Sequence, residues 1–273
     1  MNLMVASLIQ LWQYRDLIQK LASKEIKVRY KHPILGLLWA LLVPVSMILI
    51  FSFVFSVFLK TPYQQVPFVA YISTAIFPWT FFQLAVGSCA TCVVDSGSLI
   101  KKVYFPRELI PLSVVLANLV NFLISMGFLV LALRFLGIEW TWRLILLPFV
   151  IMLHIIFTTG LALVVSALQV QFRDMKYIVE IALALWFYLV PVFYPVSILQ
   201  SYSLPVMTLY FLNPMVGIVT LYRWILLPPY TELLPSFIPW MGLVGYNIVI
   251  GVGMLVIGTR IFRKHQGVFA DWI

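Results

Sequence analysis

Residues 33–59 read PILGLLWALLVPVSMILIFSFVFSVFL, a stretch without any charged side chain. A transmembrane helix needs about 20 mostly apolar residues, and each charge at the bilayer centre costs about 2.5–3.5 kcal/mol. This stretch is therefore long enough and apolar enough to cross a bilayer. The rest of the chain has the same character, because 63% of its 273 residues are apolar and 10% are charged. Soluble domains carry about 25% charged residues, so the composition excludes a water-soluble globule.

Charged residues divide the chain into six uncharged runs whose composition suits a membrane. The runs are Pro33–Leu59, Thr61–Val94, Leu109–Leu133, Leu144–Phe172, Ile181–Tyr222 and Leu233–Thr259. They lack strict alternation of apolar and polar residues, which favours helices over a closed barrel. We predict one span in each of the first four runs and one in the last. These five spans cover residues 35–59, 68–94, 109–133, 144–169 and 237–262.

The run Ile181–Tyr222 is too long for one helix and too short for two spans with a comfortable turn. It contains four prolines and the polar cluster QSYS at residues 200–203. We predict a fifth span over 179–199 and then a re-entrant outer hairpin over 200–228, which must be covered by protein or line a cavity. The predicted fold is thus an all-α polytopic membrane protein with six transmembrane helices in one domain, residues 1–273.

Basic residues set the predicted orientation of these spans. With both termini inside, fourteen of the eighteen Lys and Arg residues fall on the inner side. The inner residues are Arg15, Lys20, Lys24, Lys27, Arg29, Lys31, Lys101, Lys102, Arg107, Arg173, Lys176, Arg260, Arg263 and Lys264. The positive-inside rule favours this orientation. The net charge of +9 then reflects topology and contact with anionic lipids rather than nucleic-acid binding.

Residues 13–31, before the first span, are predicted to form an amphipathic interface helix. Its apolar face carries Tyr14, Leu17, Ile18, Leu21 and Val28, and its other face is basic and polar. The pair His32-Pro33 ends the helix, because a residue before proline is pushed out of the α region. A basic amphipathic helix lies in the plane of the membrane interface. The residues alone leave open whether it does more than anchor the chain.

The chain lacks the common motifs of nucleotide and metal chemistry, since it has no phosphate-binding loop, no Gly-x-Gly-x-x-Gly and no His-Glu-x-x-His. We interpret Cys89 and Cys92 as packing residues and His154 as a bundle-facing histidine. Almost no ionisable group lies within the predicted spans, which argues against ion-coupled transport. Energy for moving a substrate would then enter through inner loops such as residues 95–108, here called the docking loop.

Four blocks of sequence, taken in order, are similar to one family of transporters. They are EIKVRYK at 25–31 with LGLLW at 35–39 and Pro44; LIKKVYFPRE at 99–108 with Pro111; VQFRD at 170–174; and Asn213-Pro214, Tyr222-Arg223 and Phe269-Ala270-Asp271. Together they resemble the permease subunits of type-2 ABC exporters for polysaccharides and polyol phosphates, such as O-antigen and teichoic acid. The resemblance covers the whole chain. Two departures, His32-Pro33 and Gln169, affect only the break between the interface helix and the first span.

The resemblance implies contacts with a separate ATPase subunit. A coupling helix within residues 95–103 would dock on that ATPase, and the interface helix would make a second contact. The implied coupling residues are Leu99, Lys101, Lys102, Tyr104, Phe105, Arg107, Glu25, Arg29 and Tyr30. The hairpin over 200–228 would gate the exit, with Asn213 and Arg223 as outer-gate residues. The alternative for the basic residues is simple topological anchoring.

Aromatic side chains are expected to line a path for a sugar polymer, because sugar C–H faces stack on rings and many weak contacts permit sliding. The candidates are Phe51, Phe55, Phe58, Tyr71, Trp79, Phe82, Trp186, Tyr188 and Tyr194. An alternative remains open, since Trp and Tyr populate both membrane interfaces and Phe packs everywhere in lipid.

The sequence therefore predicts a permease subunit, without catalytic residues, that exports a lipid-linked, O-antigen-like polysaccharide across the inner (plasma) membrane. Two permease copies would pair with two ATP-binding subunits, which would hold ATP and Mg²⁺. No cofactor, metal or nucleic acid is expected on this chain. One alternative is an exporter of teichoic acid, small lipids or drugs. Another is a membrane-embedded glycosyl- or acyltransferase, for which His32 and His265 lack a matching acidic cluster.

Overall fold

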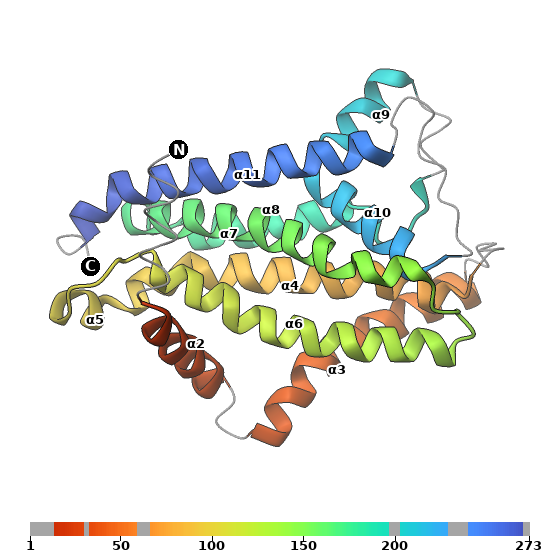
Figure 1. Ribbon diagram of the computed structural model, residues 1–273, viewed down its shortest axis with the longest axis horizontal. Helices are drawn as coiled ribbons and strands as arrows, with labels where there is room; N and C mark the ends of the chain where they lie inside the picture. Colours follow the sequence, from red (N-terminus) through yellow and green to blue (C-terminus); the bar gives the residue numbers. More distant parts are fainter. Residues whose placement is uncertain (1–13, 30–32, 59–65, 197–202, 229–239, 270–273) are drawn as a thin grey trace.

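The computed structural model describes residues 14–29, 33–58, 66–196, 203–228 and 240–269. These residues form an elongated bundle of helices, and the described part contains no β-strand (Figure 1). The all-α fold class is therefore confirmed. The helices are α2 (Arg15–Arg29), α3 (Pro33–Phe53) with a π-helical continuation (Val54–Phe58), α4 (Phe68–Asp95), α5 (Gly97–Lys102), α6 (Leu109–Phe135), α7 (Leu147–Gln171), α8 (Met175–Tyr188), α9 (Leu204–Phe211), α10 (Pro214–Leu226) and α11 (Trp240–His265).

Four helical segments of the described chain are long and apolar enough to cross a membrane. They are α4, α6, residues 142–171 and α11. The segment 142–171 comprises α7 and the short 3-10 helix Trp142–Leu146 that leads into it. The pair α9 and α10 passes the same test together but is bent by 82°. The described residues thus hold four or five candidate spans, and the count of six stays a prediction.

The predicted fifth span, residues 179–199, differs from the observed helix. Helix α8 begins at Met175 and ends at Tyr188, and residues 189–195 have no regular structure. Pro191 explains the early end, because proline has no amide hydrogen for the helix and its ring clashes with the preceding turn. Uncharged length alone did not reveal this break.

Helix α4 is the central helix of the bundle and packs against α3, α6, α7, α8 and α10. Its small residues Ala75, Ala85 and Ala90 are buried together with large aromatic rings. Helix α2 packs through its apolar face on α6, while the basic side chains of Arg15, Lys20, Lys24 and Lys27 are exposed. The amphipathic division expected for residues 13–31 is therefore present over Tyr14–Lys27, where the side chains are described.

Helices α7 and α11 lie side by side over much of their length (Figure 1). A Cβ atom at Gly160 would lie 2.5 Å from the backbone of Met254 and Leu255, and one at Gly258 would collide with the carbonyl of Gly160. The two backbones are thus in direct contact. Small residues commonly permit such close approach between helices in membranes.

Candidate functional site

The docking loop forms one end of the bundle, together with the last turn of α11 (Figure 1). Within the loop, α5 ends at Lys101 and Lys102, whose positive charges suit a helix C-terminus. Both lysines and Tyr104 are exposed, whereas Phe105 is only 6% exposed and packs in the apolar core. Leu99 packs partly against the same core. The loop therefore presents a charged and phenolic surface that is anchored by Phe105.

Two contacts join the docking loop to the end of α11 and to the residue that directly follows it. The Arg263 guanidinium donates from Nε to Glu108 Oε1 at 2.5 Å and from Nη2 to Oε2 at 3.4 Å. The neighbouring Arg107 donates from Nη1 to the backbone carbonyl of Gln266. Glu108 and Arg263 are 155 residues apart in the sequence, so only the fold brings them together.

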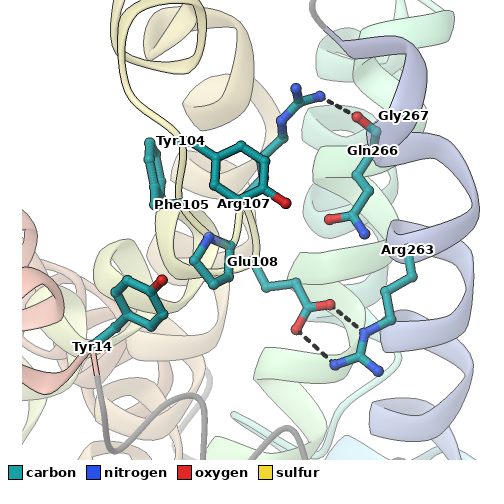
Figure 2. A pocket seen from close by; sticks show the side chains of 9 residues that line it. Tyr14, Tyr104, Phe105, Arg107, Glu108, Arg263, Gln266 and Gly267 are labelled. Carbon is teal, nitrogen blue, oxygen red and sulfur yellow. Dashed lines mark hydrogen bonds and ion pairs between the residues drawn. The ribbon is translucent and has the colours of Figure 1, made fainter.

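A cavity of about 600 Å³ lies between these segments (Figure 2). Its walls come from the residue before α2, from the docking loop, and from the end of α11 with the turn that follows it. The lining residues are Tyr14, Tyr104, Phe105, Pro106, Arg107, Glu108, Arg263, Gln266 and Gly267. The structure thus places three sequence-predicted residues (Tyr104, Phe105 and Arg107) on one cavity.

Four other predicted coupling residues, Leu99, Lys101, Lys102 and Glu25, are not among the residues that line this cavity. Lys101 and Lys102 are exposed on α5, and Glu25 is half-buried on α2. Only the backbone of Arg29 is described, and Tyr30 lies outside the described residues. Sequence reasoning missed Arg263 and Gln266 as the partners of the loop residues Glu108 and Arg107. No short motif signals these partners, because both lie in a segment that is far from the loop in the sequence.

At the opposite end of the bundle, Asn213 joins α9 to α10 (Figure 1). Its Oδ1 accepts hydrogen bonds from Met215 N (3.1 Å) and from Trp186 Nε1 (2.9 Å), and its Nδ2 donates to the Leu189 carbonyl (3.3 Å). Asn213 therefore caps the N-terminus of α10 and ties it to the end of α8.

Arg223 on α10 is fully buried. Its Nη2 donates to the carbonyls of Pro191 and Val192, the latter at 2.9 Å, and its guanidinium carbon lies 3.7 Å from the centre of the Tyr71 ring. A buried cation needs such hydrogen bonds and ring contacts to offset its lost hydration. Both predicted outer-gate residues thus hold the irregular segment 189–192, which lies where the α8 helix has ended.

A chain of tyrosines extends this contact. The Tyr71 hydroxyl donates to the Tyr194 carbonyl at 2.7 Å, and the hydroxyls of Tyr194 and Tyr210 lie 3.0 Å apart. Helices α4, α9 and α10 and the segment after α8 are therefore joined by polar contacts. We refer to residues 203–228 and their partners in 189–196 as the hairpin region.

The predicted path-lining aromatics fall into three groups by exposure. Phe58 is 70% exposed and Tyr188 is 62% exposed, whereas Tyr71, Trp79 and Phe82 are buried inside the single chain. The others are partly buried: Phe51 and Phe55 pack on Phe193, and Trp186 packs on Phe82, while Tyr194 lies in the tyrosine chain described above. The lining role stays a prediction, and the buried group would have to be uncovered before it met a substrate.

His154 is buried, and its Nδ1 lies 3.4 Å from the Tyr222 hydroxyl among the rings of Phe81 and Phe122. Cys89 and Cys92 are also buried, and Cys89 Sγ lies 3.5 Å from the Pro111 carbonyl. In the described parts of the chain, no three His, Cys, Asp or Glu side chains gather as a metal site would require. These three residues lie in packed interior positions.

Several helices of the described chain are long and apolar enough to cross a membrane, which defines the class as a multi-pass membrane protein. The chain belongs to the ABC-2 type transporter family, whose model matches residues 16–227. It is 35% identical over 271 residues to the O-antigen export system permease protein RfbA of Myxococcus xanthus, covering 99% of this chain and all of that protein. Two proteins of the same name from Klebsiella pneumoniae are 27% and 26% identical, each over 94% of both chains. The chain is thus a transport subunit of this family.

Proposed function

We propose that this chain is the permease subunit of an ATP-driven exporter that moves a lipid-linked, O-antigen-like polysaccharide across the inner membrane. The observation that carries the proposal is its end-to-end similarity to a protein named as an O-antigen export permease. The four sequence blocks and the excess of basic residues on one side agree with it.

The assembly that we propose contains two copies of this chain and two ATP-binding subunits. Both termini lie in the cytoplasm, so that the docking loop faces the ATPases. ATP and Mg²⁺ bind to the ATPase subunits, and this chain needs no cofactor. Its exposed lysines and Tyr104 supply the docking surface, since tyrosine is enriched at protein interfaces and charged side chains suit their polar rim.

In this proposal, transport couples movements at the two ends of the helix bundle, the docking loop and the hairpin region. Closure of the ATPases on ATP displaces the docking loop, and the hairpin region opens at the far side. The chain itself binds, shields and releases the polymer without covalent chemistry. Exposed rings such as Phe58 and Tyr188 offer the weak stacking contacts that a sliding polymer requires.

The deletion of this gene tests the proposal in the cell. The deletion strain should lose surface polysaccharide and accumulate the lipid-linked polymer at the inner leaflet, and a plasmid copy should reverse both effects. Normal surface polysaccharide in the deletion strain would refute the proposal. In purified complexes, ATPase activity that responds to drugs or small lipids but not to the lipid-linked glycan would favour the alternative type of exporter.

A further inference from the structure

The ion pair between Glu108 and Arg263 connects the docking loop to α11, so that a displacement of the loop would be transmitted to this helix. The Glu108 side chain is 12% exposed and that of Arg263 30% exposed, so water screens the pair only in part. Both carboxylate oxygens accept from one guanidinium, which fixes the relative orientation of the two groups. Such a pair resists both separation and rotation.

Glu108 stands where the docking loop enters the membrane bundle, directly before α6 begins at Leu109. Arg263 stands in the last turn of α11. The hydrogen bond from Arg107 to the Gln266 carbonyl lies next to the pair and adds a second tie (Figure 2). Two consecutive residues, Arg107 and Glu108, therefore fasten the end of the docking loop to the last turn of α11 and to the residue that directly follows this helix.

The other end of α11 is fastened to the hairpin region. The Tyr246 hydroxyl donates to the Leu212 carbonyl at 2.6 Å, which lies at the bend between α9 and α10. The ring centroids of Trp240 on α11 and Trp224 on α10 lie 5.2 Å apart. A Cβ atom at Gly217 on α10 would collide with the side-chain amide of Asn247 on α11. Helix α11 thus contacts the bend of the hairpin and one face of α10.

Helix α11, which carries these attachments near its two ends, is one uninterrupted helix of 26 residues, about 39 Å long at 1.5 Å per residue. Its backbone lies directly against α7 at Gly160 and Gly258, which limits its sideways bending. A rigid element with polar attachments at both ends is the kind of physical connection that couples distant sites.

We propose that Glu108 and Arg263 are positioning residues that transmit movement of the docking loop through α11 to the hairpin region. This inference rests on the proposed function, because it takes the docking loop to be the part that the ATPase moves. Loss of the ion pair should uncouple the two ends while leaving the ATPase contact surface intact, since neither residue belongs to the exposed face of Lys101, Lys102 and Tyr104.

The test uses the complete permease–ATPase complex in vesicles and compares E108Q, R263Q and the charge swap E108R/R263E. Each single variant should bind the ATPase and hydrolyse ATP as the wild type does, but export per ATP should fall by about five-fold or more. The swap should restore much of that ratio. The control R260Q removes an exposed cation one turn away on α11 and should leave export unchanged.

A second readout follows the hairpin directly. The variant L209C, substituted at an exposed position of α9, should react faster with a membrane-impermeant maleimide when ATP is added to the complex that is otherwise wild type. In E108Q and R263Q this ATP-dependent increase should disappear, and in the swap it should return. If the ion pair only stabilised the fold, its loss would lower the melting temperature without changing this response.

The outcomes separate the inference from the proposed function. Wild-type export per ATP and a wild-type labelling response in both single variants, or failure of the swap to restore either, would overturn the inference. Failure of the wild-type complex to export any lipid-linked glycan would instead refute the proposed function.

Discussion

The guanidinium carbon of Arg223 lies 3.7 Å from the centre of the Tyr71 ring, so that a buried cation joins α10 to the central helix α4. The same guanidinium donates to the carbonyls of Pro191 and Val192. One side chain therefore holds the hairpin region, the segment after α8 and the bundle core together.

Arg223→Ala should lower the free energy of unfolding by about 2–5 kcal/mol, because it leaves two carbonyls without their donor and removes the ring contact. The measurement is thermal unfolding of the purified complex. Arg143 provides a matched control, since it also donates to a carbonyl and lies over a ring, that of Trp224, but is only half-buried. Arg143→Ala should cost about 1 kcal/mol. Equal effects of both variants would contradict a special role for the buried cation.

Gly160→Ala and Gly258→Ala should each destabilise the protein by about 1–3 kcal/mol, because an added methyl group would collide with backbone across the α7–α11 contact. The control is Gly253→Ala, since a Cβ atom at Gly253 meets nothing within 4 Å. That variant should be neutral or slightly stabilising, as alanine favours helices over glycine. Thermal unfolding of the three variants distinguishes them. Tolerance of alanine at both Gly160 and Gly258 would show that the two helices do not touch at these positions.

Tyr104→Ala and Phe105→Ala should have opposite consequences, although the residues are adjacent. Tyr104 is exposed, so its loss should weaken co-purification of the ATPase without lowering the melting temperature. Phe105 is buried, so its loss should cost about 3–5 kcal/mol of stability.

Pull-down of the tagged ATPase and thermal unfolding check this pair of variants. Lys102→Ala should behave as Tyr104→Ala does, since Lys102 is exposed on the same loop. Full ATPase association in both exposed-site variants would refute the docking role of this surface.

Phe58→Ala and Tyr188→Ala should reduce export of the polymer while leaving stability within about 1 kcal/mol of the wild type, because both rings are exposed. Trp79→Ala and Phe82→Ala should instead cost about 3–5 kcal/mol, because both rings are buried in the single chain. Export assays and thermal unfolding on the same preparations separate path lining from packing. Unchanged export in both exposed-site variants would exclude these rings from the path.

Much of the fold was predictable from the spacing of charged residues. The uncharged runs predicted helices where α4, α6, α7 and α11 lie, and the sequence between Asp95 and Glu108 predicted a short, charged inner loop with two lysines. The energy of moving a side chain from water into lipid depends on that side chain alone, and it sums along the sequence. Composition therefore determined that this chain is helical and suited to a membrane.

Only the tertiary structure decided which groups meet. Glu108 pairs with Arg263, one of eighteen basic residues, and Arg223 donates to backbone carbonyls. The rings of Trp79 and Phe82 are buried, whereas that of Phe58 is exposed. An aromatic ring is about equally stable in lipid and in a packed interior, because both surroundings are apolar. Its position in the sequence therefore carries no information about its neighbours. Contacts between distant segments depend on the packing of whole helices, and this packing is what creates the candidate site.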